Sequence, residues 1–323
     1  MAAVPVAAAR VVVVGSFNVD HVWSVAALPL PGETLGGSYA SGPGGKGFNQ
    51  AVAAARAGAA TRFVCALGSD AGGQLARALA AADGIDLRDQ ASDIATGTAG
   101  IVVDAKGRNS IVVGAGANAA LSAAHVMSHR DAFQDAAVVL AQLESPQATV
   151  LQALLLAREF GGVAMLNPAP ANAVTDDALM AAVDILTPNE TEFVALLQRH
   201  HGVALAAEDV SGLDDRTLHG LCRRLLPSGT IVVTLGAAGA FVSHADGMRR
   251  GDGEPCYRLA AIAVDAVDTT GAGDAFNGAL AASLALHPTS VFAQHARFAT
   301  RYASQSTTRA GAAMAMPHAH ELT

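Results

Sequence analysis

Residues 268–278 carry the clearest chemistry in the sequence, because they read Asp-Thr-Thr-Gly-Ala-Gly-Asp-Ala-Phe-Asn-Gly. The segment follows an apolar stretch at 262–267 that predicts a strand, and it opens an apolar helix. Gly271, Ala272 and Gly273 leave the backbone N–H groups at the helix start unobstructed, and the helix dipole adds positive potential there. The pattern therefore predicts an anion hole that needs no lysine.

Asp274 lies in the first turn of that helix, and its carboxylate has two interpretations. It could cap the helix by accepting hydrogen bonds from free N–H groups. Alternatively, it is the base in a phosphoryl transfer to an alcohol. In that case the carboxylate takes the hydroxyl proton while the N–H groups stabilise the oxygens of the transferring phosphoryl group. Residue types and spacing alone leave both interpretations open.

Residues 42–50 form a second glycine cluster, Gly-Pro-Gly-Gly-Lys-Gly-Phe-Asn-Gln. It is not a Walker phosphate-binding loop, because Lys46 is followed by Gly47 rather than by Ser or Thr. A flexible turn with one exposed lysine is the simpler interpretation. However, Lys46 is one of only two lysines in the chain, and Asn49 follows it by about one helical turn. Both side chains are therefore candidates to hydrogen-bond the hydroxyl groups of a small polyol.

A third polar segment follows the first predicted strand, 11–14, and reads Gly-Ser-Phe-Asn-Val-Asp over 15–20. Ligands bind at the carboxyl ends of strands in open α/β sheets. Asn18 and Asp20 share one face if the segment is extended, and such a pair suits two neighbouring hydroxyl groups. A simple turn is the alternative for this pair.

The elements that would position these residues alternate along the chain. Short Val/Ile runs alternate with Ala/Leu-rich stretches, and this pattern predicts an α/β fold with a mainly parallel sheet covered by helices. The predicted strands are 11–14, 61–66, 137–141, 163–166, 184–186 and 231–235. The predicted helices are 47–57, 72–82, 146–159, 190–198, 217–225, 271–286 and 289–304.

Two segments break this alternation and predict a small β layer. Residues 21–40 hold short alternating pieces, and 97–116 read as a hairpin with strands at 99–104 and 109–113. Both segments are predicted to be antiparallel. Such a layer has an exposed edge or face that substrate or another subunit must cover. No linker divides the chain, so we expect residues 1–323 to form one domain. Its discontinuous β lid would come from about 18–43 and 97–116.

Composition excludes several other classes of protein. The net charge is −8 and no basic patch occurs, which argues against nucleic-acid binding. No stretch of about 20 residues is apolar enough to predict a membrane span. Cys65, Cys222 and Cys256 form no CxxC pair, so we expect neither disulfides nor a zinc site, and a reducing cytoplasm fits best. Residues 1–9 lack the basic start of a signal peptide.

Taken together, these motifs resemble the ribokinase family of sugar and nucleoside kinases. Both family signatures are present, at 44–50 and 268–274. Other matching segments keep the family's order, at 15–21, 31–34, 114–118, 142–146, 166–170 and 187–192. The resemblance implies a three-layer α/β/α core with a small β-sheet lid. It also implies MgATP-dependent phosphorylation of D-ribose at O5, giving D-ribose 5-phosphate and ADP.

The resemblance assigns roles to individual residues. Asp274 matches the catalytic base that takes the proton of the ribose 5-hydroxyl. Gly271, Ala272 and Gly273 match the anion hole. The positions that match ribose contacts are Asn18, Asp20, Gly45, Lys46, Asn49 and Glu144, together with Asp274. The positions that match nucleotide contacts are Asn189, Thr234, Leu235, Gly236, Gly273 and Thr300.

The resemblance also implies two kinds of cation and a partner. Asn189 and Glu192 match an Asn-x-x-Glu motif that supports Mg²⁺ and phosphate placement, with the carboxylate acting through water. Family members often use K⁺ beside the anion hole, and the matching positions are Asp268, Thr270, Ser306, Arg309, Gly311 and Ala315. Ala315 departs from the hydroxyl-bearing residue of relatives, and Thr300 from their histidine near the adenine. Relatives commonly pair their lids into a homodimer.

Three alternatives remain at this level. The same chemistry on another acceptor, such as a nucleoside, deoxyribose or a ketohexose, would differ only in the polyol pocket. A catalytically silent sugar-binding sensor would not need Asp274 and its anion loop. A nicotinamide-linked oxidoreductase would need Gly-x-Gly-x-x-Gly after the first strand, where the chain has Gly-Ser-Phe-Asn.

Overall fold

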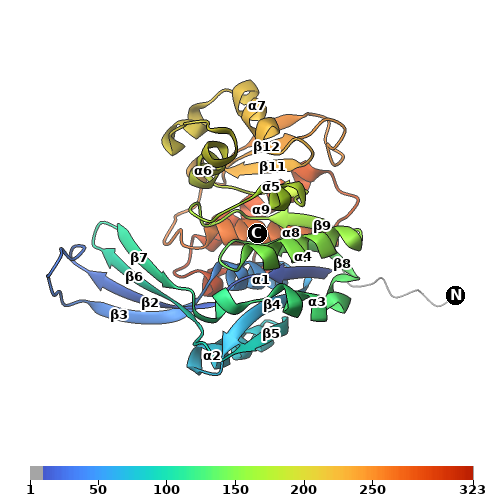
Figure 1. Cartoon of the computed structure of the whole chain (residues 1–323). Coiled ribbons are helices and arrows are strands. Elements are labelled where there is room, and N and C mark those ends of the chain that lie inside the picture. Colours follow the sequence, from blue (N-terminus) through green and yellow to red (C-terminus); the bar gives the residue numbers. More distant parts are fainter. Residues whose placement is uncertain (1–9, 323) are drawn as a thin grey trace.

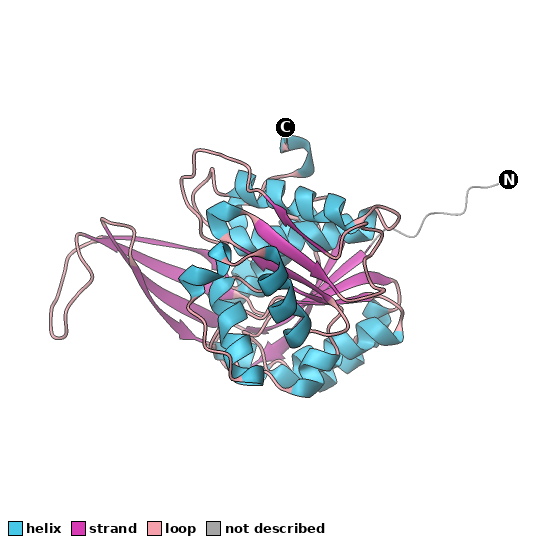
Figure 2. Cartoon of the chain, turned by 90° about the horizontal axis from the view of Figure 1, so that it is seen from above, coloured by secondary structure: helices cyan, strands magenta, loops and turns pink. Residues whose placement is uncertain are grey.

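The computed structural model describes residues 10–322 of the chain and shows a nine-stranded central sheet between two layers of helices (Figures 1 and 2). The strand order is β13-β12-β11-β10-β9-β8-β1-β4-β5. All neighbouring strands from β5 to β11 are parallel, whereas β12 is antiparallel to both of its neighbours. The predicted α/β class and mainly parallel sheet are therefore confirmed.

The strands of the central sheet are β1 (Arg10–Val14), β4 (Ala60–Gly68), β5 (Asp86–Ser92), β8 (Ala136–Ala141), β9 (Val163–Leu166), β10 (Ile185–Leu186), β11 (Thr230–Thr234), β12 (Ala240–His244) and β13 (Cys256–Leu259). Helices α1 (Lys46–Arg56), α2 (Ala71–Ala82), α8 (Ala272–Leu286) and α9 (Phe292–Ser306) pack on one face. Helices α3 (Ala123–Ser128), α4 (Gln147–Glu159), α5 (Asp177–Ala181), α6 (Glu190–His201) and α7 (Asp215–Leu225) pack on the other.

The first strand shows why the sheet is sandwiched. Val11 and Val13 enter the core beneath α1 and α8, while Val12 and Val14 enter the core beneath α4 and α6, and all four are fully buried. A strand buried on both faces reads as a continuous apolar run, as this one does. The small side chains of α1 and α8, mostly alanine and glycine, let these two helices pack closely against each other and against the sheet.

A second sheet of four strands projects from one side of the core (Figure 1). Its strands are β2 (Asn18–Val25), β3 (Ser38–Gly44), β6 (Gly97–Asp104) and β7 (Asn109–Gly114), in the order β3-β2-β6-β7. The predicted hairpin is confirmed, because β6 and β7 are antiparallel neighbours.

The pairing of β2 with β6 is parallel, so the small sheet is mixed rather than wholly antiparallel as its sequence pattern predicted. The reason lies in the core. β2 leaves the central sheet after β1 and β6 leaves it after β5, and those core strands run in the same direction. The two emerging strands therefore run side by side in the same sense.

The strand predicted at 262–267 is wrong, because residues 260–266 have no regular secondary structure. The end of this segment is held instead by the C-terminus of α9. The N–H groups of Val267 and Asp268 both donate to the Thr307 carbonyl, at 2.8 and 3.1 Å. Ile262 and Val267 are exposed, and the segment lines a cavity rather than extending the sheet.

No helix within residues 10–322 has the length and apolar character needed to span a bilayer. The interpretation that residues 1–9 are not a signal peptide concerns a part of the chain that lies outside the described residues.

Arg56, the last residue of α1, ties together three parts of the fold. Its guanidinium donates to both carboxylate oxygens of Asp83, at 2.8 and 3.1 Å, and the two side chains are only 12% and 10% exposed. It also donates to the carbonyl groups of Ala313, Met314 and Met316 in the C-terminal segment. This arrangement fixes the segment that lies beside the start of α8.

We expect Arg56→Met to destabilise the protein strongly, because it leaves the Asp83 carboxylate and several carbonyl groups without their donor. The loss of one partner of a buried pair costs about 3–5 kcal/mol. In a chain of this size that lowers the thermal unfolding midpoint by roughly 5 °C or more, measurable by calorimetry. The control is Arg88→Met, which removes a surface pair with Asp86 and should cost about 1 kcal/mol or less. Equal shifts in the two variants would contradict the role given to Arg56.

Candidate active site

The candidate site lies at the carboxyl ends of the central parallel strands, where ligands bind in open α/β sheets. Glu144, Asn167 and Asn189 follow β8, β9 and β10 respectively. The start of α1 faces this edge, because the Lys46 N–H donates to a Glu144 carboxylate oxygen at 3.0 Å. The start of α8 faces it too, because Asp274 contacts the same part of α1.

The Asp274 carboxylate is buried and is held by two side chains of α1. Asn49 Nδ2 donates to its Oδ2 at 2.9 Å, and Gln50 Nε2 donates to its Oδ1 at 2.8 Å. The N-cap of α8 is Gly271, and no side chain caps that helix end. The interpretation of Asp274 as a helix cap is therefore wrong, and its carboxylate faces the edge of the sheet instead.

The first turn of α8 has the openness that the glycine pattern predicted. Gly271 adopts a φ of 76°, and a Cβ there would lie 2.9 Å from the Cβ of Ala312, so both conformation and space require glycine. A Cβ on Gly273 would meet nothing within 4 Å. The Ala272 N–H donates to the Thr269 carbonyl at a long 3.2 Å, so an incoming anion would compete with a weak bond.

Glu144 anchors the start of α1. Its Oε2 accepts from the Ser16 hydroxyl at 2.6 Å as well as from the Lys46 N–H. Gly45 precedes the helix with a φ of 86°, and a Cβ there would lie 2.8 Å from the backbone nitrogen of Asn18. Glycine is therefore required at the point where the loop passes β2.

Asp20 and Asn18 lie on β2, opposite glycines that leave room for their side chains. A Cβ on Gly44 would come within 2.1 Å of the Asp20 carboxylate, and one on Gly97 within 2.3 Å of Asn18 Oδ1. Asn118 fixes Asn18 by donating from Nδ2 to Asn18 Oδ1 at 2.8 Å. The predicted spacing on one strand face therefore places both polar groups where the small sheet meets the core.

Asn49 Oδ1 is buried and finds no hydrogen-bond partner among residues 10–322. A buried acceptor without a partner is costly, and the cost disappears when a ligand donates to it. Because Asn49 Nδ2 is bonded to Asp274, the free oxygen lies beside the candidate base. A hydroxyl donor is the complementary ligand group.

The electrostatics of the site depend on one cation among four carboxylates. Burial alone acts to lower the pKa of Lys46, but Asp274, Glu144, Glu192 and Asp20 together raise it above its usual value. The amine is therefore charged. It opposes the burial that raises the pKa of Asp274, although the pKa of Asp274 remains above its usual value.

Asp20 on β2 also has a perturbed carboxylate. Burial, Glu144 and Asp274 raise its pKa to about 6, while Lys46 acts in the opposite direction. The pKa of Glu192 is also raised, mainly by burial. Perturbed carboxylates that lie close to one another are typical of a functional site.

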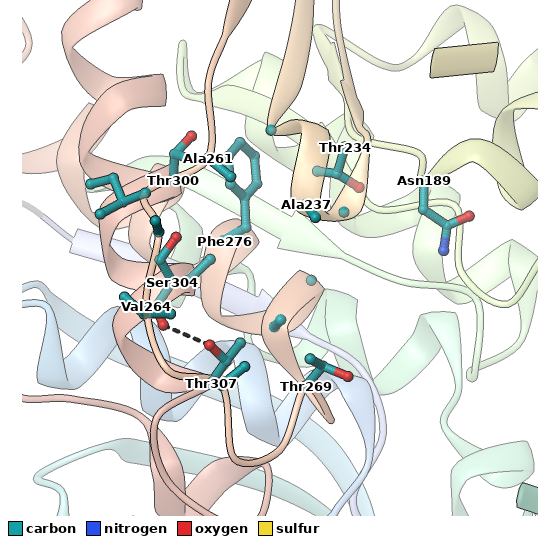
Figure 3. A pocket seen from close by; sticks show the side chains of 18 of the residues that line it. Asn189, Thr234, Ala237, Ala261, Val264, Thr269, Phe276, Thr300, Ser304 and Thr307 are labelled. Atoms are coloured by element: carbon teal, nitrogen blue, oxygen red, sulfur yellow. Dashed lines mark hydrogen bonds between the residues drawn. The ribbon is translucent and has the colours of Figure 1, made fainter. Parts of the chain in front are cut away.

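Two cavities meet at the start of α8. A smaller one, about 170 Å³, is lined by Lys46, Asn167, Glu192, Asp274 and the glycine turn. A larger one, about 580 Å³, lies between the start of α8, α9 and the 261–266 segment (Figure 3). Both are lined by Asn189, Thr234, Thr269, Ala272 and Gly273. The larger volume suits a cofactor-sized ligand, and the smaller one leads from it to Asp274.

The residues matched to nucleotide contacts divide into two groups. Asn189, Thr234 and Gly236 line the larger cavity together with Thr300, but the Thr300 hydroxyl already donates to the Ala296 carbonyl at 2.9 Å. Leu235 is buried and does not line the cavity. Its N–H donates to the Gly239 carbonyl, so it shapes the turn after β11.

Asn189 and Glu192 form a capping box at the start of α6. Asn189 Oδ1 accepts from the Glu192 N–H at 2.8 Å, and Glu192 Oε2 accepts from the Asn189 N–H at 2.9 Å. No group of three metal-ligating side chains occurs within residues 10–322. The remaining Glu192 oxygen fits Mg²⁺ held mainly by water and substrate phosphates, which is the usual mode for this ion.

Three of the residues matched to a monovalent cation, Asp268, Thr270 and Gly311, lie together just before the anion hole. Asp268 accepts from the N–H groups of Thr270 and Gly311, both at 2.9 Å. Burial acts to raise the pKa of Asp268, but these bonds lower it overall, so the carboxylate stays charged and suits a cation. The Ser306 hydroxyl donates to Ala303, and the Arg309 side chain pairs with Glu321. The Arg309 side chain carries no acceptor, so this position could offer only its backbone oxygen, and Ala315 offers no hydroxyl.

A buried carboxylate beside an open helix N-terminus, beneath a nucleotide-sized cavity, defines a phosphotransferase that acts on a small alcohol. The pfkB family carbohydrate kinase model matches residues 8–319, and the chain belongs to this family. It is accordingly a carbohydrate kinase.

Several individual proteins that this chain resembles are ribokinases. The ribokinase of Haemophilus influenzae is 38% identical over 312 residues, which cover 96% of this chain and 95% of that protein. The structure of ribokinase from Thermotoga maritima is 31% identical, with a TM-score of 0.83 and 97% coverage of both chains. The structure of Arabidopsis thaliana ribokinase complexed with ribose and ATP is 29% identical, with a TM-score of 0.80 and 97% coverage of both chains.

The site also contains residues for which the sequence predicted no role. Gln50, Asn118 and Asn167 lie in segments that carried the family resemblance, and Asn277 lies in the segment with the clearest chemistry. All four are buried and hydrogen-bonded around the predicted residues. Their signal in the sequence was that they are polar residues in otherwise apolar surroundings.

We expect Lys46→Met to raise the pKa of Asp20 above about 6, because Lys46 is the charge that holds this pKa down. Carbon-13 NMR of the labelled side-chain carboxyl groups, titrated without ligand, would measure it. The control is Lys106→Met, which removes the exposed lysine of the β6–β7 turn and should leave the Asp20 pKa unchanged. An unchanged or lower pKa in Lys46→Met would contradict the arrangement described.

Proposed function

We propose that the chain phosphorylates D-ribose at O5 with ATP, giving D-ribose 5-phosphate and ADP. The observation that carries this proposal is the Asp274 carboxylate, buried between an unpartnered sugar-side acceptor on Asn49 and the open first turn of α8. The likeness to ribokinases over almost the whole chain supports ribose as the acceptor.

In the proposed reaction the ribose 5-hydroxyl approaches Asp274, which accepts its proton as O5 attacks the γ-phosphorus of ATP. A new P–O5 bond forms while the bond to the β-phosphate oxygen breaks, and ADP leaves with those electrons. The N–H groups at the start of α8 stabilise the charge on the phosphoryl oxygens. When bound, Mg²⁺ would neutralise the phosphates, and Glu192 and Asn189 would orient it through water.

The sugar is proposed to lie between the β2 side chains and the start of α1. Asn18, Asp20, Lys46, Asn49 and Glu144 offer both donors and acceptors to its hydroxyl groups. The small sheet would act as a lid over them and exclude water, which would otherwise compete as the phosphoryl acceptor.

The free thiols of Cys65, Cys222 and Cys256 are consistent with a reducing cytoplasm.

Asp274→Asn tests the assignment of the base. The amide cannot accept the proton, so kcat should fall by about 100- to 10,000-fold. D-ribose affinity, measured by calorimetry, should stay within a few-fold because the amide keeps the size and shape of the side chain. The control is Asp93→Asn, an exposed site that should keep full activity. Near-normal turnover in Asp274→Asn would show that the base is misassigned.

The acceptor itself is tested by assaying ADP release with a panel of sugars and nucleosides. D-ribose should give the highest kcat/KM among D-ribose, deoxyribose, ketohexoses and adenosine. A higher kcat/KM for another acceptor would show that the protein is a kinase with a substrate other than D-ribose. If no acceptor in the panel leads to ADP release, the result would favour the catalytically silent sugar-binding sensor.

A monovalent cation is proposed beside Asp268, where the carboxylate stays charged at the edge of the anion hole. Bound K⁺ would add positive potential close to the transferring phosphoryl group. Activity should therefore be higher in K⁺ than in Na⁺ at equal ionic strength, and Asp268→Asn should abolish the difference. Indifference of the unmodified enzyme to both ions would remove this site.

A homodimer through the lid is proposed from the apolar residues that the small sheet exposes. Trp23 and Tyr39 are neighbours across β2 and β3, and Val112 on β7 is 74% exposed. Exposed apolar groups on a sheet with two free edges favour a second copy as their cover. Sedimentation at micromolar concentration should show a dimer, weakened in Val112→Asp. A monomer throughout would contradict lid pairing.

A further inference from the structure

A continuous row of polar side chains lies beneath Asp274, at the carboxyl ends of three adjacent strands. Gln142 follows β8, Asn167 follows β9 and Thr187 follows β10, and Gln50 on α1 bridges the first two. The exposed fractions of these four side chains run from 0% to 6%. None of them has a role in the chemistry assigned so far.

The direction of each hydrogen bond in the first part of the row follows from the base. An ionised carboxylate only accepts, so Gln50 must turn its Nε2 toward Asp274. Its Oε1 then faces Gln142, which must present its own Nε2 as the donor. Inverting either amide would bring two acceptors together. The three groups therefore share one consistent set of directions, in which Gln142 donates to Gln50 and Gln50 donates to Asp274.

The second part of the row continues to the anion hole. Gln50 Nε2 also donates to Asn167 Oδ1 at 3.0 Å, so Asn167 Nδ2 is free to donate to the Thr187 carbonyl at 2.9 Å. The Thr187 hydroxyl donates to Asn277 Oδ1. Asn277 Nδ2 then donates to the Gly273 carbonyl at 2.8 Å. One chain of side chains thus contacts both the carboxylate and the glycine turn.

We propose that Gln50, oriented by Gln142, is a positioning residue that holds the Asp274 carboxylate in its reactive place, and that the Asn167–Thr187–Asn277 branch holds the glycine turn in register with it. The proposal rests on the proposed kinase function. Gln50 does not touch the reacting atoms in this account. It acts through Asp274.

The charges around Asp274 explain why such support matters. Asp20 on β2, Glu144 after β8 and Glu192 on α6 are negative neighbours, and Lys46 on α1 is the one cation among them. Burial raises the pKa of Asp274, while Lys46, Asn49 and Gln50 each lower it. Removal of the Gln50 donor therefore favours the protonated form, which cannot act as the base.

The test compares Gln50→Met with the unmodified enzyme. Methionine keeps the length of the side chain but donates no hydrogen bond. We expect kcat to fall about 10- to 100-fold, in proportion to the loss of one bond to a charged group, with KM for D-ribose nearly unchanged. The acid limb of the kcat–pH profile should move to higher pH. Gln142→Met should shift the acid limb in the same direction but less. In this variant the Gln50 amide keeps its donor and loses only the partner that fixes its orientation.

A control variant removes a half-buried glutamine that lies elsewhere. Gln90 donates to the Ala120 carbonyl at 2.7 Å and accepts from Ser122, away from the site. Gln90→Met should lower the thermal unfolding midpoint without moving kcat or the pH profile.

Thr187→Val tests the second branch. It should lower kcat while leaving the acid limb in place, because it disturbs the glycine turn and not the carboxylate.

Carbon-13 NMR of the Asp274 carboxyl group, titrated without substrate, separates this inference from the proposed function. A higher Asp274 pKa in Gln50→Met supports the positioning role whatever the acceptor is. If D-ribose is turned over normally by Gln50→Met and the Asp274 pKa is unchanged, the inference is overturned while the kinase function stands. If the unmodified protein phosphorylates no acceptor, the proposed function fails, and the NMR titration still decides whether Gln50 governs Asp274. If Gln50→Met does not fold, the same titration on Gln142→Met decides in its place.

Discussion

The burial of the Asp274 carboxylate is the constraint on which the rest of the site depends. A buried negative charge is stable only if donors and a counter-charge surround it. Two amides of α1 and the amine of Lys46 supply these, so α1 must begin beside α8. The close packing of the two helices, made possible by their alanines and glycines, is therefore a requirement of the candidate site as well as of the core.

Much of the fold could be predicted from the sequence, because local patterns decide local structure. The predicted strand at 163–166 matches β9, and the predicted helix at 146–159 differs from α4 by one residue. The strand predicted at 262–267 failed because an apolar run does not reveal its partner. That partner is the end of α9, some forty residues away, instead of a neighbouring strand. The parallel pairing of β2 and β6 was likewise decided by where two distant core strands end.

The candidate site shows the same division. Asp274, Lys46 and the glycine turns stood out because their types and spacing carry chemistry within a few residues. Gln50 and Gln142 did not, because they are 92 positions apart and only the folded sheet makes one the orienting partner of the other. The direction of their hydrogen bond depends in turn on a carboxylate more than 200 positions further along from Gln50. The spacing of residues in the sequence does not reveal hydrogen-bonded series of this kind.

The parallel pairing of β2 and β6 has a mechanical consequence. Each strand joins the core through a short connection, residues 15–17 after β1 and 93–96 after β5. β3 and β7 return to the core at the same end, so the small sheet is attached along one line. A plate attached in this way tilts about that line and resists twisting. Because Asn18 and Asp20 lie on β2 close to the attachment, a tilt of the sheet would carry their side chains with it. A tilt that brings the small sheet over the proposed sugar site would therefore also move the side chains that are proposed to bind the sugar.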